Sequence, residues 1–188
     1  MVLGGRFTGQ GVTSDNLPHC LDNTGEDKSI DVDDMIEEVP AFSTAVDEQR
    51  SDIGQEAISQ AKKSGATGPV TFSVSTDWEG GEASSKESEK YFDATGSFDY
   101  DQTGTVPAYP PAEPGGKWTY EADTALNVRD RYNWDSGKGV EIDVPDWVPG
   151  YPDKINVSDT QMQRLRQSRR ARECNIAGSS EKSTHTGP

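Results

Sequence analysis

The chain has 188 residues, with 33 acidic and 18 basic side chains, a formal net charge of −15 and a pI near 4.4. A charge of this sign repels phosphate backbones and anionic lipid surfaces, which disfavours nucleic-acid binding by the protein as a whole. Only 31% of the residues are hydrophobic and the mean hydropathy is −0.82, so the core is thin or part of the chain lies outside it. We expect no transmembrane segment, because no run approaches the roughly 20 apolar residues that one needs.

The two ends of the chain are polar and lack a sustained hydrophobic period. Residues 1–30 are predicted to be an irregular or disordered arm, and residues 179–188 a disordered tail. No continuous apolar run follows Arg6, so the chain shows no recognisable signal peptide. Export would therefore use another signal or a longer parent chain.

Residues 31–65 form a predicted helical segment, interrupted by Pro40 and ended by Gly65. Apolar residues recur in it at helical intervals, and Gly54 weakens it by about 1 kcal/mol relative to alanine. This apolar stripe consists of Phe42, Val46, Ile53, Ala57, Ile58 and Ala61. A structural helix is the favoured interpretation, with a partner-binding helix as the alternative.

Residues 66–178 are predicted to form a β-rich domain with a carboxy-terminal helix. Apolar and polar residues alternate in three segments, around 70–74, 94–100 and 118–128, and the even positions of the last should face the core. Exposed connections are expected over 79–90 and 107–116, which are rich in Gly, Ser, Glu or Pro.

Further strands are indicated around 140–144 and 155–157, before a last helix. Ser158 and Gln161 have the spacing of a capping box, which predicts a helix from Asp159 to about Cys174. The predicted fold is therefore α+β: a mostly antiparallel sheet with an amino-terminal helical arm and one carboxy-terminal helix.

The segment 130–138 concentrates polar and aromatic side chains at the end of the longest strand pattern. Its carboxylates could act as a base, its phenol as a donor and its lysine as an anion stabiliser. The candidate catalytic residues are Asp130, Tyr132, Asn133, Asp135 and Lys138. The same residues also suit a structural turn, in which Asp and Asn bond their own backbone.

The predicted last helix carries arginines that could bind an anion through paired hydrogen bonds, notably Arg164, Arg169 and Arg172. A solvated face, or pairing with nearby acids, explains them equally well. No metal site is predicted, because neither the acidic clusters nor His19 and His185 have a ligand spacing. The two cysteines, Cys20 and Cys174, could form one bridge or remain free thiols.

Five segments together resemble a carboxy-terminal domain of exported actinobacterial proteins of the polymorphic-toxin or type VII secretion type. They are the strand ending at Trp78, residues 91–104, the strand from Trp118, the aromatic turn at 130–138 and residues 159–178. The resemblance covers roughly residues 41–180. It implies a secreted, toxin-like protein of interbacterial competition, with a protein partner or further domains of a longer parent chain.

A strand leading into Asp130-x-Tyr132 is also remotely similar to the catalytic segment of the colicin M family, which cleaves a lipid-linked pyrophosphate. Asn133 stands where that family has an aspartate, and the downstream His-Arg pair is absent from this sequence. Because an amide is not a carboxylate base, these differences argue against the same chemistry here.

Three classes of function follow from these patterns. The first is a secreted effector domain, hydrolytic at the turn 130–138, with its reaction and cofactors unassigned. The second is a non-enzymatic binding or structural module of a secreted or particle-associated assembly. The third is an acidic immunity-type inhibitor, which suits the net charge of −15 but not the aromatic turn.

Overall fold

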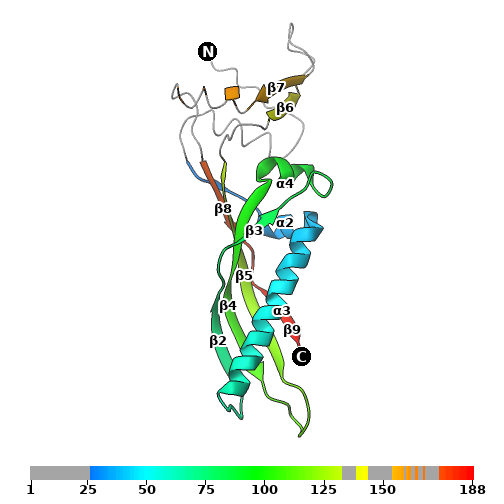
Figure 1. Ribbon diagram of the computed structural model, residues 1–188, viewed down its shortest axis with the longest axis vertical. Helices are drawn as coiled ribbons and strands as arrows, with labels where there is room; N and C mark the ends of the chain where they lie inside the picture. Colours follow the sequence, from blue (N-terminus) through cyan, green and yellow to red (C-terminus); the bar gives the residue numbers. More distant parts are fainter. Residues whose placement is uncertain are drawn as a thin grey trace.

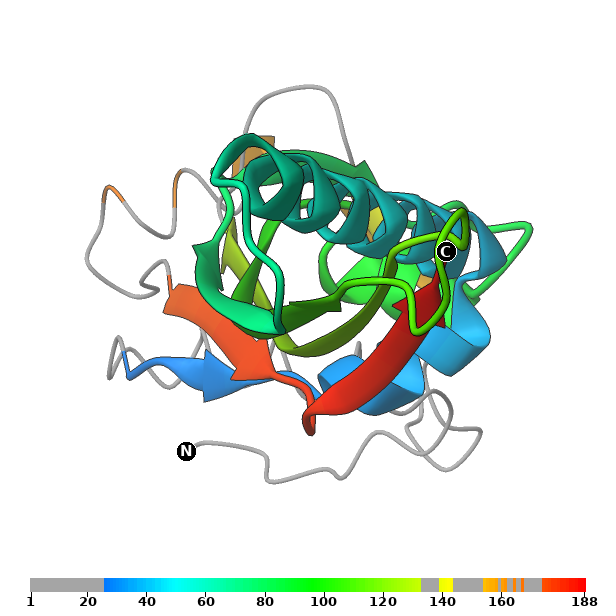
Figure 2. The ribbon, with the colours of Figure 1, turned by 90° about the horizontal axis from the view of Figure 1, so that it is seen from below.

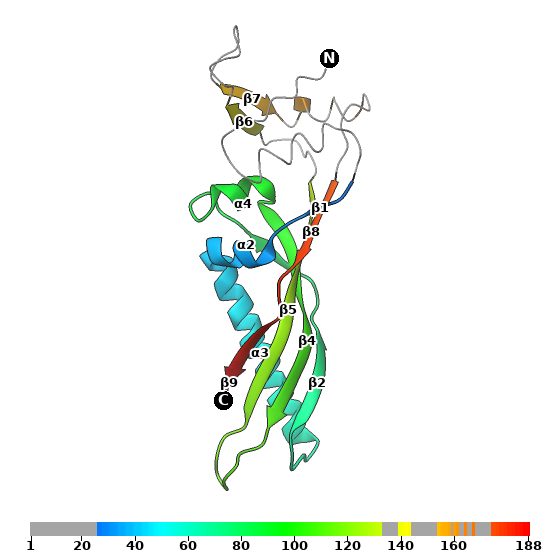
Figure 3. The ribbon, with the colours of Figure 1, turned by 180° about the vertical axis from the view of Figure 1, so that it is seen from behind.

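The structure is a computed structural model, which describes residues 26–132, 139–143, 154–158, 160–161, 164, 167 and 174–188. Figure 1 labels the helices and every strand except β1, which is labelled in Figure 3. The helices are α2 (Val32–Glu38), α3 (Pro40–Lys63) and α4 (Glu89–Ala94). The strands are β1 (Lys28–Ser29), β2 (Val70–Ser75), β3 (Glu79–Glu82), β4 (Ser97–Tyr109), β5 (Thr119–Tyr132), β6 (Gly139–Asp143), β7 (Lys154–Ser158), β8 (Cys174–Ser179) and β9 (Ser183–Gly187).

Seven strands form one sheet around the long central pair β4 and β5. β2 and β3 pair with the side of β4 that faces away from β5. β8 and β9 pair with the side of β5 that faces away from β4, and β1 pairs with β8. All of these pairings are antiparallel except β1 with β8. β6 and β7 form a separate antiparallel hairpin, which lies beyond α4 in Figures 1 and 3.

On each side of the central pair, two strands follow one another and are separated by a bulge: β2 and β3 beside β4, and β8 and β9 beside β5. Residues 76–78 lie opposite only 101–102, and residues 180–182 opposite only 125–126. Both bulges meet the same rung, because Gln102 and Leu126 are paired with each other. Bulges increase the local twist, in keeping with a sheet that curls around α3 in Figure 2.

A hydroxyl side chain completes each bulge. The Gln102 N–H donates to Thr76 Oγ1 at 2.9 Å, and the Thr76 N–H donates to the Gln102 carbonyl at 3.0 Å. On the other side, Ser180 exchanges the equivalent bonds with Leu126, at 3.0 and 2.8 Å. Thr76 and Ser180 therefore satisfy backbone groups that the extra residue would leave without a ladder partner.

The helix α3 lies lengthwise over one face of the sheet (Figures 1 and 3), with its apolar stripe turned toward β4 and β5. In β5 the even positions from Tyr120 to Val128 are buried, as the alternation predicts. Gly54 allows the closest approach, because a Cβ there would lie 2.2 Å from the Tyr120 ring. The helix accepts a glycine because a larger residue would displace that ring.

Two hydrophobic clusters fill the space between α3 and the sheet. The upper core, as oriented in Figure 1, includes Phe42, Val46, Tyr91, Phe98, Tyr100, Leu126, Val128 and Ile176. The lower core is built from Ala57, Ile58, Ala61, Val106, Ala108, Tyr120 and Ala122. The part of the sheet that packs on the upper core is its upper half, and the part that packs on the lower core is its lower half.

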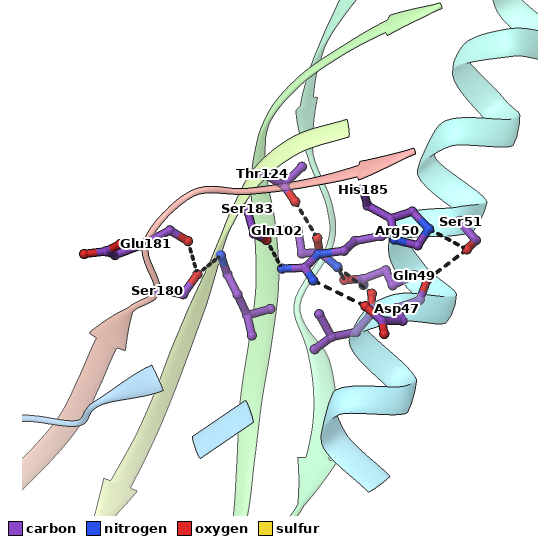
Figure 4. A network of polar contacts seen from close by, with 12 residues as sticks. Asp47, Gln49, Arg50, Ser51, Gln102, Thr124, Ser180, Glu181, Ser183 and His185 are labelled. Carbon is purple, nitrogen blue, oxygen red and sulfur yellow. Dashed lines mark hydrogen bonds and ion pairs between the residues drawn. The ribbon is translucent and has the colours of Figure 1, made fainter. Parts of the chain in front are cut away.

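A polar layer lies between the two cores. The fully buried Gln102 donates to the Val46 carbonyl at 3.2 Å and to Gln49 Oε1 at 2.8 Å. It accepts a 2.9 Å bond from the hydroxyl of Thr124, which is also buried. Beside it, Arg50 donates to the Ser183 hydroxyl at 2.6 Å, so that the layer continues from α3 to β9 (Figure 4).

The structure confirms the α+β fold, the mostly antiparallel sheet and the amino-terminal helix, but no carboxy-terminal helix packed on the sheet is seen in the described residues. Of residues 159–173 only Thr160, Gln161, Arg164 and Gln167 are described, each helical. The capping-box bond is present, with the Ser158 N–H donating to Gln161 Oε1 at 2.9 Å.

The chain continues into strands after these residues. Cys174, predicted to end a helix, begins β8, and residues 183–187 form β9 where the sequence indicated a disordered tail. The reason is that both segments complete the free side of β5, where their backbone groups find ladder partners despite a composition rich in Gly, Ser and Thr. The connection 79–90 likewise contains β3 and the start of α4. Residues 1–25 of the predicted arm lie outside the described residues.

Candidate functional site

A groove of about 750 Å³ lies in the upper half of the sheet, where β3, β4, β5 and β8 run side by side. Its exposed residues, such as Asp99 and Arg131, alternate with core residues that point toward α3, so the groove is on the outer face of the sheet. It is lined by Gly80, Gly81, Glu82, Ser97, Phe98, Asp99, Arg129, Asp130, Arg131, Asn175, Ile176 and Ala177.

One wall of the groove is a guanidinium held between an aromatic ring and a carboxylate. The Arg129 guanidinium carbon lies 3.9 Å from the centroid of Trp78, and its Nη2 lies 3.3 Å from Asp99 Oδ2 on the neighbouring strand. Both charged side chains are half exposed, so this ion pair contributes at most about 1 kcal/mol to stability. The ring and the carboxylate together orient the planar Arg129 guanidinium before any ligand binds.

Two glycines of β3 shape the opposite side. A Cβ on Gly81 would lie 2.5 Å from the Phe98 ring, so that position requires close backbone approach to the core. A Cβ on Gly80 would meet no atom within 4 Å. The missing side chain of Gly80 therefore leaves open space beside Asp99, its partner on β4.

A polar network lies next to the groove on the same outer face. Asn127 donates to Asp101 Oδ1 at 2.8 Å and accepts a 2.7 Å bond from the Ser179 hydroxyl. Asp101 is only 6% exposed although it is on the outer face. These bonds join β4, β5 and β8 side chain to side chain next to the groove.

The structure brings part of the predicted site to this groove. Asp130 is half-buried in β5, paired with Ile176, and lines the groove together with Arg131. Tyr132 is the last residue of β5 and pairs with Cys174. The other predicted catalytic residues, Asn133, Asp135 and Lys138, lie outside the described residues.

The predicted anion site and disulfide stay predictions. Arg164 is described as an exposed helical residue, whereas Arg169 and Arg172 lie outside the described part of the chain. Cys174 is buried in β8, and Cys20 is also outside that part. Within the described ranges, no group of three or more His, Cys, Asp or Glu side chains could hold a metal ion.

The position of His185, which β9 brings against α3, was not predicted from the sequence. Its Nε2 lies 3.3 Å from Ser51 Oγ (Figure 4). Its ring also stacks on Tyr120. The Ser51 hydroxyl also donates to the Asp47 carbonyl at 3.0 Å, and its contact with His185 joins α3 to β9.

A second polar cluster joins α2 to α4. The hydroxyl of the fully buried Tyr91 donates to Asp34 Oδ2 at 2.7 Å, and Lys90 pairs with both Asp34 and Glu38. The hydrogen bond from Lys90, followed by that from Tyr91, holds the pKa of Asp34 below its ordinary value. Burial and then the Asp34 carboxylate raise the pKa of Tyr91, which stays a neutral donor. The cluster fastens α2 to α4.

Comparisons with family models, with curated proteins and with solved structures found no match to this chain. In the described residues, no helix is both long and apolar enough to cross a membrane. Function must therefore be inferred from the groove itself.

Proposed function

We propose that this protein is a binding module, and that the outer groove of the upper half holds an extended polar segment of a partner protein. The single observation that carries the proposal is a preformed groove whose donors are already oriented, with Arg129 fixed between Trp78 and Asp99. Preorganised polar groups lose little conformational entropy on binding.

The border of the groove favours a polypeptide as the ligand. β3 pairs only with β4 among the described strands. Because the Ala83 N–H donates to the Gly96 carbonyl of the β4 side, the alternation of an antiparallel ladder directs the backbone groups of Gly80 and Glu82 the other way. An extended peptide can bond to such an edge while its side chains enter the groove.

Charge and size agree with a short polar peptide. The lining combines the guanidinium groups of Arg129 and Arg131 with the carboxylates of Glu82 and Asp99. Such a mixed lining suits a segment that carries both a carboxylate and hydrogen-bond donors. The volume of about 750 Å³ is within the usual range of ligand sites.

A peptide library displayed on phage and panned against the full chain tests this proposal. We expect selected peptides to bind the wild type and Thr105→Leu, but not Gly80→Leu. Gly80 faces open space, so leucine there fills the groove without a clash. Thr105 is exposed on the outer face of the lower half, so Thr105→Leu adds the same side chain away from the groove.

Peptides that bind Gly80→Leu as tightly as the wild type would place recognition elsewhere. Failure to select any specific peptide from a library that yields binders to a control protein would argue against a peptide-binding groove.

A hydrolytic secreted effector is the second candidate, because Asp130 is half-buried and lines the groove beside Arg131. In this case the protein acts on a competing cell, and Asp130 serves as a base. The chain would be produced with and without an export signal in a sensitive bacterium. Growth arrest that Asp130→Asn abolishes, with the variant still folded, would favour the effector. Absence of arrest in both compartments would contradict it.

A further inference from the structure

The strand β2 forms an open edge in the lower half of the sheet. It pairs with β4 over all six residues, Val70 to Ser75, and no other described strand pairs with it. Its sequence, VTFSVS, has high β-propensity and contains no proline or glycine. It is therefore suited to pair with a further strand.

The ladder shows which backbone groups are open. The Thr76 N–H donates to the Gln102 carbonyl of β4. Because these bonds alternate along an antiparallel ladder, the backbone N–H and C=O groups of Val74, Phe72 and Val70 also point toward β4. Thr71, Ser73 and Ser75 then direct their N–H and C=O groups to the outer side. These three residues are also exposed.

The apolar side of this strand is incompletely covered. Val70, Phe72 and Val74 pack against the lower core, but each is only partly buried. Ile53 of α3 is a fourth partly buried residue of the same cluster. A neighbouring strand would therefore extend the core and remove apolar surface from water.

The edge strand lies in the longest run of the chain without a charged side chain. Residues 64–76 contain no charged side chain, whereas the chain as a whole carries a net charge of −15. Natural edge strands usually carry charges or proline that prevent pairing. A second copy of an acidic protein would be repelled almost everywhere, and this uncharged stretch is where two copies can approach.

We infer that β2 is a dimerisation strand, and that its occupant is β2 of a second copy in antiparallel orientation. Such pairing is isologous, so each residue makes the same contact in both copies. Centred on Ser73, it aligns Thr71 with Ser75 of the partner subunit and lets the outward backbone groups of all three residues bond. The partner's Phe72 then lies beside Val74.

The antiparallel arrangement also leaves the groove open. β2 and β3 follow each other along β4, so the groove lies beyond Ser75. In the pair, the second copy runs the other way and carries its own β3 beyond Val70. A dimer would therefore present two separate grooves.

Sedimentation and light scattering over a series of concentrations test the inference with the full chain. The wild type should form a dimer that dissociates on dilution. Ser73→Lys should raise the dimer dissociation constant about tenfold or more, because two lysines would face each other across the two-fold axis. The matched control is Thr105→Lys. Thr105 is exposed and pairs directly with Ser73, but it lies on the central strand β4.

A second variant identifies the contact directly. Ser73→Cys should yield a covalent dimer under mild oxidation, since paired antiparallel residues have Cα atoms about 5.5 Å apart, within disulfide range. Thr105→Cys should not exceed the wild-type background. A wild type that stays monomeric at every concentration, or a dimer that Ser73→Lys leaves intact and Ser73→Cys does not cross-link, would overturn the inference.

Discussion

The upper and lower halves of this sheet solve the same packing problem with different side chains. In the upper core, Phe42 meets Phe98 and Tyr100 edge to face, with ring centroids 4.8 and 5.1 Å apart. The lower core faces α3 with alanines, and Gly54 lets the helix approach the Tyr120 ring. Large side chains stabilise by buried area, whereas small ones allow close approach of helix and sheet.

The difference matches what each half presents outside. The upper half has a well-filled core beneath the outer groove, so the groove stands on a rigid support. The lower half has the thinner core and the open edge β2. The buried Gln102 separates the two, and it bonds to both α3 and the neighbouring strand. The comparison predicts that the two halves respond differently to substitution.

The largest effect is expected in the upper core. Phe42→Ala removes a ring that packs against two others at 3% exposure and should lower the free energy of unfolding by about 3–5 kcal/mol. Urea denaturation measures this difference. Thr44→Ala, on the exposed side of α3, is the control and should cost less than about 1 kcal/mol. Equal effects would show that the aromatic cluster does not support the fold as described.

Removing the polar layer should have the next largest effect. Gln102→Leu deprives the buried Thr124 hydroxyl of its acceptor and should cost about 1–3 kcal/mol. Adding Thr124→Val removes the hydroxyl that has lost its acceptor. The free energy of unfolding of the double variant should therefore fall by less than the sum of the two single changes. Strict additivity in thermal or urea unfolding would mean that the two side chains are not coupled.

The lower core can be tested by overpacking. Gly54→Ala improves helix propensity by about 1 kcal/mol but places a methyl group against Tyr120. Overpacking costs about 1–3 kcal/mol, so we expect a small net loss of stability. In the background Tyr120→Leu the same change should become neutral or stabilising. Stabilisation in the wild-type background would contradict the close approach.

The smallest effect is expected in the polar cluster that joins α2 to α4. The folded pKa of Asp34 lies below its ordinary value of 3.8, so its contribution is complete above that pH. It is lost as the pH falls through the lower folded pKa. The stability difference between the wild type and Asp34→Asn should therefore shrink below pH 3.8, as measured by urea unfolding at several pH values. A difference that grows on acidification would refute this sign.

Long periodic segments were predictable because periodicity reports which face is buried. The stripe of α3 and the even positions of β5 are in the predicted places. β8 and β9 were not, because their residues form strands only when β5 offers ladder partners. Of the site, Asp130 could be expected at the end of β5, but Trp78 and Gly80 could not. Trp78 lies in the bulge between β2 and β3, and Gly80 contributes only open space. Neither feature produces a hydrophobic periodicity that the sequence would reveal.

The most direct test of the binding groove is a nuclear magnetic resonance titration of the isotope-labelled chain with a selected peptide. Shifts of the amide signals should concentrate on Gly80, Gly81, Asp99, Arg129, Arg131 and Ala177, which line the groove. Signals from β9 and the carboxy-terminal half of α3 should not move. Shifts confined to the lower half, with the groove signals unchanged, would contradict the proposed function.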